Sequence, residues 1–551
     1  MSRLAVSALL PLLWPSLALA QDQGAPLESR AVAAEEELAA TPAPVEAEVE
    51  PTVEPQAQPE VQPTPQPDVS PKAPKPESGL KFLGLMQTKG SASNLTSTNP
   101  FLDGQVLGTF GGSNGLTVGE DRSAAVEQRV TGFFTYSPQV LSGRASLTAG
   151  FEIDYAFGDQ SYVTGGNVGG AYGADAVNLQ TRRLMATLKP NLGDSVRLSL
   201  VLGQQFVSDS VSDPAVSGPD ELFRSGGKLM FFGSEATGVS AYARVRNGWG
   251  DVVKGRLGAY SLYERGTYMR DDVWLVMADV QVNPLYATHF GAHLWTLRDR
   301  SGGAQGIFGL GPTSALAELQ GAARLDLRPE GETVAPLVSA DLVWVTLDAA
   351  FNRDLRLSPL GATAMVTANT GTLYAEGTNN VRVRGAVANA EVRLRYAPGE
   401  GSVARLEALW SSADDADPLT YSGVITGNSY GIVGAIYASH GTLLLFSDLF
   451  SINRMASVVY DVSGGGGGVR AVTGSVGYDL VPGRVTVAVG GGHARDGAGL
   501  PYGNEVNLRV VTEPYLFMRV GLWGAMMTPG EAALVNETAY AAYLGFDWLV
   551  F

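Results

Sequence analysis

Long runs of strictly alternating apolar and polar residues constrain this chain more than any other feature. From Arg144 to Tyr155, apolar side chains occupy every odd position, and polar residues or glycine occupy every even one. Residues 195–206 and 239–249 repeat the pattern. Successive side chains of a strand point to opposite faces, so these runs predict strands with one apolar face and one polar face.

The length of the runs separates two kinds of all-β protein. Strands of soluble sandwiches usually have about 5–6 residues, whereas these runs have about 10–14, the length that crosses a bilayer when tilted. Tight turns also alternate with long loops rich in Gly, Ser, Asn and Asp, as in outer-membrane barrels. The predicted tight turns are 137–143, 190–194, 234–238, 283–285, 398–402, 439–441, 481–483 and 513–514. The predicted long loops are 89–123, 158–175, 209–221, 299–314, 352–380, 411–427, 453–468 and 494–504.

The runs predict an all-β fold, a transmembrane antiparallel β-barrel of 18–20 strands that occupies residues 79–551. The candidate strands lie near 80–88, 124–137, 142–157, 175–189, 195–208, 223–233, 238–249, 272–283, 286–298, 316–328, 336–352, 381–396, 402–413, 429–438, 441–452, 468–480, 484–494, 504–512, 515–527 and 537–550. Residues 250–271 fit either a loop or a hairpin. Bacterial barrels have even strand numbers, so 18 or 20 is expected.

Two segments precede the predicted barrel. Residues 1–20 have the pattern of a cleaved export signal, with Arg3, an apolar stretch and the small-residue site Ala18-Leu19-Ala20. Residues 21–78 contain 12 Pro and 12 acidic residues against three basic ones. Such a composition predicts a disordered, extended periplasmic linker. It is either a passive acidic spacer or a tether to the cell wall or a periplasmic partner.

Composition excludes several functions. The chain has no Cys, which rules out disulfides, thiolate metal sites and cysteine nucleophiles. Its net charge of −17 and lack of a basic patch disfavour nucleic-acid binding. No motif indicates an enzyme or a cofactor. After the export signal, no uncharged apolar run reaches the roughly 18 residues of a membrane helix.

The polar face of the strands is expected to line the lumen and set selectivity. The basic candidates are Arg129, Arg144, Arg197, Arg244, Arg246, Arg324, Arg393, Arg395, Arg405, Arg509 and Arg519. The acidic candidates are Glu127, Glu152, Asp154, Glu318, Asp326, Glu391, Glu407, Asp479 and Glu505. This mixture fits two interpretations, cross-strand ion pairs that brace the wall or an arginine-biased constriction for an anion.

The last strand has the pattern of a barrel-assembly signal, in which a polar or aromatic residue, Gly, an aromatic and an apolar residue recur at fixed spacing. The residues that match are Tyr543, Gly545, Trp548 and Val550, and the aromatic Phe551 follows them. The expected partners are therefore the outer-membrane lipid bilayer and the barrel-assembly machinery.

Part of the chain resembles the alginate-export type of outer-membrane porin. The resemblance is scattered along the chain and strongest near its C-terminus, in residues 503–530, where G-x-E leads into a strand that ends in Pro529-Gly530, and it includes residues 201–226. Gln204 and Met526-Met527 depart from the residues usual in that family. The resemblance implies an 18-stranded pore for a large or charged solute.

Three smaller features complete the candidate sites. His289 and His293 are expected to lie about 13 Å apart on one strand face, as isolated polar residues that cannot share a metal. Gly464–Gly468 is expected to form a flexible loop, and it lacks the Lys-Ser/Thr of a phosphate-binding loop. The acidic cluster of Asp414, Asp415 and Asp417 is expected to form either a solvated loop or a surface Ca²⁺ site.

We therefore expect a porin-like channel in the outer membrane that passes small or charged solutes, anions or polysaccharide among them. The alternative is a non-conducting barrel that anchors a surface or periplasmic assembly through residues 21–78. Residues 89–123, the largest predicted loop, fit either an inward plug or a lid.

Overall fold

The computed structural model describes only part of the chain. The described residues are 79–97, 116–138, 141, 143–157, 176–209, 231, 233–248, 250–263, 273–300, 337–375, 379–426, 437, 439, 441–446, 457–459, 462–515, 517–533 and 535–550. All of them belong to the compact unit Pro74–Phe551. The predicted export signal 1–20 and linker 21–78 lie outside these residues.

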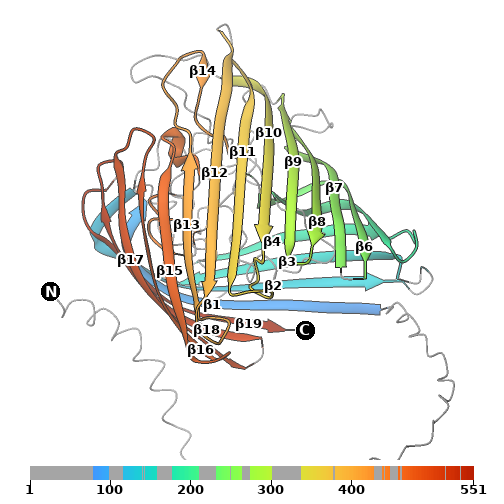
Figure 1. Cartoon of the computed structure of the whole chain (residues 1–551), viewed down its shortest axis with the longest axis horizontal. Coiled ribbons are helices and arrows are strands. Elements are labelled where there is room, and N and C mark those ends of the chain that lie inside the picture. The colour runs from blue at the N-terminus through green and yellow to red at the C-terminus, as the bar shows by residue number, and fades with distance from the viewer. Residues whose placement is uncertain are drawn as a thin grey trace, which may run out of the picture. The chain divides into compact units, whose positions relative to one another are not determined.

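The described strands form one sheet that closes on itself (Figure 1). Nineteen strands belong to the sheet, and eighteen of them form a continuous antiparallel cycle because β14 is a two-residue strand that pairs in parallel with β12. β13 pairs directly with β15, and β1 pairs with β19 to close the cycle. The prediction of an antiparallel barrel with 18–20 strands is confirmed, at 18.

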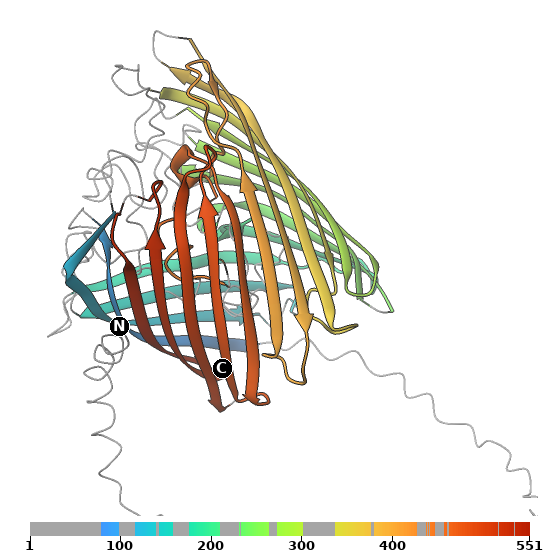
Figure 2. The same ribbon diagram turned by 60° about the vertical axis from the view of Figure 1, so that its left-hand side comes forward.

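The strand bounds are as follows. They are β1 (Gly79–Ser97), β2 (Leu116–Ser137), β3 (Ala145–Phe157), β4 (Ala176–Leu188), β5 (Val196–Ser208), β6 (Gly233–Asn247), β7 (Gly250–Tyr263), β8 (Val273–Leu285), β9 (Thr288–Asp299), β10 (Leu337–Phe351), β11 (Leu360–Ala375), β12 (Val381–Arg395), β13 (Val403–Ser411), β14 (Thr420–Tyr421), β15 (Arg470–Val481), β16 (Val485–Arg495), β17 (Pro501–Tyr515), β18 (Met518–Pro529) and β19 (Ala539–Val550). Figure 2 shows the neighbouring strands β15 to β19 from a second direction.

The strand lengths suit a bilayer. β18 has 12 residues, which extend about 40 Å and cross about 28 Å when tilted by about 45°. That depth is close to the hydrocarbon thickness of about 30 Å. No helix among the described residues is long and apolar enough to cross a membrane.

The two faces of the strands differ as the alternation predicts. Outward positions carry exposed apolar side chains such as Leu202 and Leu347, which are 60% and 62% exposed. Their neighbours Val201 and Thr346 point inward and are buried. An apolar exterior and a partly polar interior are the arrangement that a lipid-embedded barrel requires.

Two strands were missed by the sequence analysis. β7 occupies most of residues 250–271, for which the pattern predicts either a loop or a hairpin, and β11 occupies the middle of the predicted loop 352–380. β11 consists largely of Ala, Thr and Gly, so its apolar periodicity is weak. Its strand conformation is supported by ladders to β10 and β12 on both sides.

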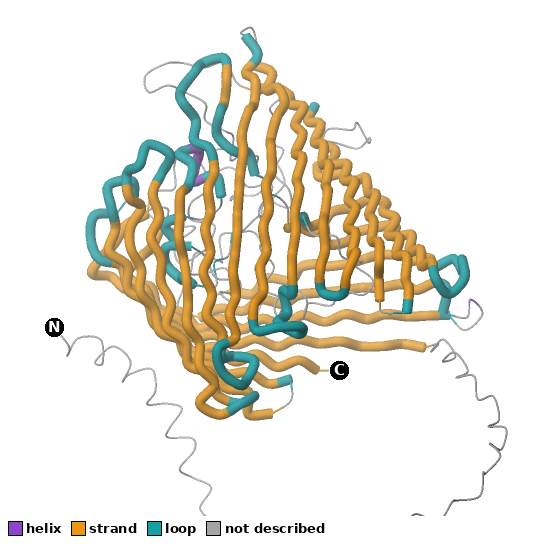
Figure 3. Tube along the Cα trace, in the orientation of Figure 1, coloured by secondary structure: helices purple, strands orange, loops and turns teal. Residues whose placement is uncertain are grey.

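Other predicted segments were wrong or lie outside the described residues. Residues 441–446 were predicted to begin a strand, but they form a buried, irregular segment. Figure 3 shows that strands make up most of the described chain. A turn does form at the predicted position 439–441, since the Thr442 amide donates to the Ser439 carbonyl at 3.2 Å, but residues 442–446 do not continue it as a strand. The run Leu443-Leu444-Leu445-Phe446 is apolar because it lies inside the barrel, not because it is a strand. Residues 316–328 and most of 223–233 and 429–438 are outside the described residues.

The predicted loop 89–123 is shorter than expected. β1 continues to Ser97 and β2 begins at Leu116, and these extensions pair with each other. Small polar residues on β1 hid the strand signal, because Ser91 and Ser93 point inward and carry no apolar pattern. Residues 98–115, on which the choice between plug and lid depends, lie outside the described residues.

Candidate functional site

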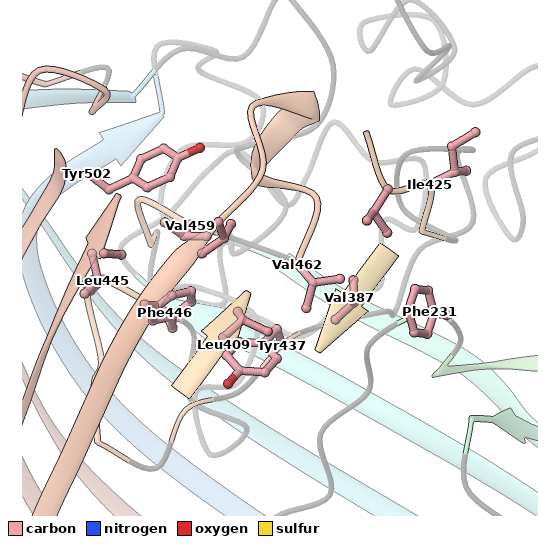
Figure 4. Packing of buried hydrophobic residues seen from close by; sticks show 14 of the residues in the cluster. Phe231, Val387, Leu409, Ile425, Tyr437, Leu445, Phe446, Val459, Val462 and Tyr502 are labelled. Atoms are coloured by element: carbon pink, nitrogen blue, oxygen red, sulfur yellow. The ribbon is translucent and has the colours of Figure 1, made fainter. Parts of the chain in front are cut away.

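The interior of the barrel holds a segment of chain between β14 and β15, here called the inner loop. Its described residues are 424–426, 437, 439, 441–446, 457–459 and 462–469. Ile425, Leu445 and Phe446 are completely buried. The Phe446 and Tyr437 rings pack edge to face with centroids 5.3 Å apart, and Figure 4 shows the wall residue Leu409 beside them. The inner loop thus forms a small apolar core within the cylinder.

One carboxylate on β17 holds three successive amides of the inner loop. Glu505 accepts the amide hydrogen of Leu443 with Oε1 at 2.6 Å, and those of Leu444 and Leu445 with Oε2 at 2.8 and 2.6 Å. Glu505 is 5% exposed. Burying a carboxylate is costly unless it is hydrogen-bonded, and these charge-assisted bonds offset that cost.

The next two inward positions of β17 extend this attachment. Asn507 donates through Nδ2 to the Gly441 carbonyl at 2.8 Å and to Oε1 of Glu505 at 2.7 Å. Arg509 donates through Nη2 to the Thr442 carbonyl at 3.3 Å. Glu505, Asn507 and Arg509 alternate along β17, so all three point inward. We call this set the β17 clamp.

The wall formed by β10 to β13 holds the inner loop from other strands. The Tyr437 hydroxyl donates to Glu407, and Asn389 donates to the same Glu407 carboxylate at 2.8 Å. Asn369 accepts the amide hydrogen of Ile425 at 3.1 Å, and the Trp344 indole donates to the Ile425 carbonyl at 2.9 Å. The inner loop is therefore fixed to two separate parts of the barrel wall.

Charged side chains cluster on the inward face of β12 and β13. In the strand register, Glu391 lies opposite Glu407 and Arg393 lies opposite Arg405. Like charges directly opposite each other repel, and here each sign is offset by the other, since Arg393 donates through Nε to Glu391. The positive charges of Arg405 and of Arg509 in the β17 clamp repel each other.

The structure places other predicted lumen residues at inward positions. Arg129 on β2 pairs with Glu152 on β3 at 3.4 Å, and both are buried. Arg244 and Arg246 share one face of β6, and Arg246 pairs with Asp251 at 3.0 Å. Arg395 follows Arg393 on the inward face of β12. Arg197 on β5 is exposed and lies opposite Arg244 in the register.

Of the remaining predicted residues that the structure describes, Arg144 alone lies outside a strand. Arg144 is exposed in the turn before β3, so it is not part of the wall. Asp154 belongs to β3 and lies opposite Arg129 in the register. Arg519 pairs with Glu513 at 3.2 Å, close to the short β17–β18 connection. Asp479 accepts the Gly401 amide hydrogen at 2.9 Å. Glu127 lies in β2, and Arg324, Glu318 and Asp326 are outside the described residues.

The residues of the predicted assembly signal lie on both faces of β19. Tyr543 points inward and stacks on Trp523 with ring centroids 5.0 Å apart, and the Lys89 ammonium lies 4.2 Å from the Tyr543 ring centre. Trp548 points outward and is 46% exposed. Gly545 and Val550 belong to the strand that closes the barrel against β1, and Phe551 is outside the described residues. Their role in assembly stays a prediction.

Two smaller predictions were wrong. His289 and His293 are not isolated, because both contact the carboxylate of Asp348. Gly464–Gly466 forms a short 3₁₀ turn rather than an unstructured loop. Glycine is needed there because φ is positive at Gly464, Gly465 and Gly466.

The acidic cluster of Asp414, Asp415 and Asp417 forms local turns. Asp414 accepts the Ser422 amide hydrogen at 3.1 Å, and Asp417 accepts that of Leu419 at 3.0 Å. Within the described part of the chain, no group of three or more His, Cys, Asp or Glu side chains has the arrangement of a metal site.

Comparison with known proteins gives only distant similarity. No protein-family model matches the sequence, and no curated protein matches it. Among solved structures, the chain is similar to Pseudomonas aeruginosa OccK5 (OpdH), with 9% identity over 85% of this chain and 98% of that one and a TM-score of 0.42. Acinetobacter baumannii OccAB4 has 12% identity over 85% and 98%, with a TM-score of 0.41. Pseudomonas aeruginosa OpdK with vanillate has 13% identity over the same shares, with a TM-score of 0.42. Since these similarities are low, function is inferred below from the barrel's own residues.

Proposed function

We propose that the protein is an outer-membrane channel whose lumen is narrowed by the inner loop and lined by charged side chains. One observation carries this proposal. The barrel has an apolar exterior, and partly exposed ions line its interior, among them Asp348, whose side chain is 23% exposed, and Arg246, at 40%. Charged groups in contact with solvent inside a closed barrel are typical of water-filled pores.

We further propose that the solute is small and charged, with a preference for anions. Arg393, Arg395, Arg405 and Arg509 share the inward faces of β12, β13 and β17 with Glu391 and Glu407. Glu505 on the inward face of β17 is a third carboxylate, so the four guanidinium groups outnumber the carboxylates by one, and guanidinium suits carboxylate or phosphate contacts. The resemblance to alginate-export porins favours an acidic polysaccharide within the same class of solute.

The test is electrical. Purified full-length protein in planar bilayers is expected to show discrete conductance steps, and a salt gradient across the bilayer is expected to give a reversal potential of the sign for anion preference. Swelling of proteoliposomes in uronic-acid oligosaccharides and in small carboxylates then distinguishes the two anionic solutes. A barrel that never conducts would contradict the proposal and favour an anchoring role for residues 21–78, which deletion of that segment would test.

The proposal includes the route to the membrane. Residues 1–20 would be removed during export, so the mature protein would begin at Gln21. Intact-mass measurement of protein from outer-membrane fractions checks this. A mature mass that retains residues 1–20 would contradict cleavage.

A further inference from the structure

Five side chains form a continuous polar network on the inward faces of four adjacent strands. Arg256 on β7 contacts Asp279 on β8 at 2.5 Å, and Asp279 contacts Nδ1 of His293 on β9 at 2.8 Å. The other ring nitrogen of His293, Nε2, lies 2.5 Å from Oδ2 of Asp348 on β10. His289 Nε2 lies 2.8 Å from Oδ1 of the same carboxylate.

The carboxylate of Asp348 can reach both histidines because no side chain stands between them. Gly291 occupies the inward position of β9 between His289 and His293. A Cβ atom at Gly291 would lie 1.9 Å from Oδ2 of Asp348 and 2.8 Å from Nε2 of His293. Asp348 lies opposite Gly291 in the register, so its carboxylate fills this space.

The contacts of His293 require two ring protons. A neutral imidazole has one N–H and one acceptor nitrogen, whereas both nitrogens donate in the imidazolium form. Both His293 nitrogens face ionisable oxygens that act only as acceptors when charged. The arrangement is therefore fully hydrogen-bonded when His293 is an imidazolium.

The charges of the network then sum to zero. Arg256 and His293 each contribute one positive charge, Asp279 and Asp348 each contribute one negative charge, and the His289 ring lies against Oδ1 of Asp348. Loss of the His293 proton leaves one negative charge in excess. Asp279 is fully buried and paired with Arg256, whereas Asp348 is partly exposed. The negative charge that acts on ions in the lumen is therefore that of the Asp348 carboxylate.

Other polar side chains of β6 to β11 also face the network. The Trp295 indole, also on β9, donates to Asp279 at 2.7 Å. Tyr260 on β7 and Tyr242 on β6 interact electrostatically with Arg256. Thr346 on β10 and Thr367 on β11 bond to each other. The nearest further cation is Lys254, one inward position from Arg256 on β7 and opposite Gln281 on β8.

We propose that His293 is a selectivity-determining residue whose protonation state sets the charge that the β8–β10 wall presents to permeating ions. With the proton bound, this part of the wall is neutral. Without it, the Asp348 carboxylate attracts cations and repels anions. The proposal rests on the proposed channel function, since its effect is on ion selectivity.

The experiment measures reversal potentials of the full-length channel in a salt gradient from about pH 5 to about pH 10. The cation-to-anion permeability ratio of the natural protein is expected to rise with pH. The rise should be about threefold to sevenfold for an ion that passes about 7 Å from the Asp348 carboxylate in water. His293→Gln should give a high ratio at every pH, because its side chain carries no charge. Asp348→Asn should give a lower ratio than the natural protein at high pH, because the carboxylate that faces the lumen is absent.

A matched control is His493→Gln, which alters an exposed histidine at the end of β16 that contacts Asn504 and Arg495. It should keep the full pH dependence. Isotope-labelled histidine spectra of the natural protein, assigned with whichever variant folds, give a second measurement and should show His293 changing from imidazolium to neutral ring over the same range.

The outcomes are distinct. A conducting channel whose selectivity does not change with pH, or whose pH dependence survives in His293→Gln, overturns the inference alone. Spectra in which His293 does not titrate overturn it as well. A barrel with no conductance at any pH overturns the proposed channel function, and the selectivity role falls with it.

Discussion

Oε2 of Glu505 on β17 accepts the amide hydrogen of Leu444 in the inner loop at 2.8 Å, although 61 positions separate the two residues in the chain. This bond and its two neighbours attach the inner loop to the wall. Glu505→Ala would leave three buried amides without their acceptor, at a cost of about 1–3 kcal/mol each. We expect the inner loop to detach, with a larger single-channel conductance and a lower unfolding temperature.

The matched control is Glu513→Ala, the same substitution on the same strand. Glu513 is half exposed and pairs with Arg519, and exposed pairs contribute about 0–1 kcal/mol. Its conductance and unfolding temperature should stay close to those of the natural protein. Equal conductance in the two variants would show that Glu505 does not position the inner loop.

Gly291→Ala tests whether the space beside Asp348 is required. The added Cβ would overlap the Asp348 carboxylate, and overpacking of this kind costs about 1–3 kcal/mol. Gly524→Ala on β18 is the control, because a Cβ there has no atom within 4 Å. Folding titrations in urea with lipid vesicles measure both. If the two alanine variants are equally stable, the Asp348 carboxylate does not occupy this space.

Arg244→Ala combined with Arg246→Ala tests the anion preference. Both side chains lie on the inward face of β6, so the double variant removes two positive charges from the lumen and should shift the reversal potential toward cations. The control is Arg382→Ala combined with Arg384→Ala, which has the same spacing on β12 but alters exposed positions of the opposite face. Equal shifts in the two double variants would mean that position on the inward face does not matter.

We predict that the stability of the turn at Asp414, which lies outside the membrane-spanning strands, depends on pH. Burial raises the pKa of the Asp414 carboxyl above its usual value, the negative charge of Asp415 adds to the rise, and the hydrogen bond from the Ser422 amide opposes it. A raised pKa means that the folded turn binds a proton more tightly than the unfolded chain. Stability of the turn therefore falls as pH rises from the unfolded pKa through the folded one.

Hydrogen exchange of the Ser422 amide measures this effect. After correction for the intrinsic exchange rate, protection should be greater near pH 4 than near pH 7. Asp414→Asn keeps an acceptor oxygen and removes the charge, so protection should become independent of pH in this range. Asp354→Asn, in an exposed turn, should leave the dependence unchanged. A natural protein with constant protection would contradict the prediction.

Much of the wall could be predicted from local pattern. The alternation in residues 144–155 and 195–206 identified β3 and β5, because a strand at a lipid boundary exposes every second side chain to an apolar solvent. Prediction failed where the outward face of a strand lacks large apolar side chains, and where an apolar run has another origin than contact with lipid. β11 has small residues on its outward face, and Leu443-Leu444-Leu445-Phe446 is apolar because the inner loop packs inside the barrel.

Local alternation is enough to predict long strands with an apolar and a polar face, and to assign most side chains to one face or the other. Which of these side chains meet depends on the folded barrel. Glu505 finds the inner-loop amides across the lumen, and Asp348 lies between His289 and His293 because β10 pairs with β9 opposite Gly291. The apolar periodicity of a strand reflects whether each face contacts lipid or water. The contacts of Glu505 and Asp348 depend instead on strand register, barrel closure and the path of the inner loop.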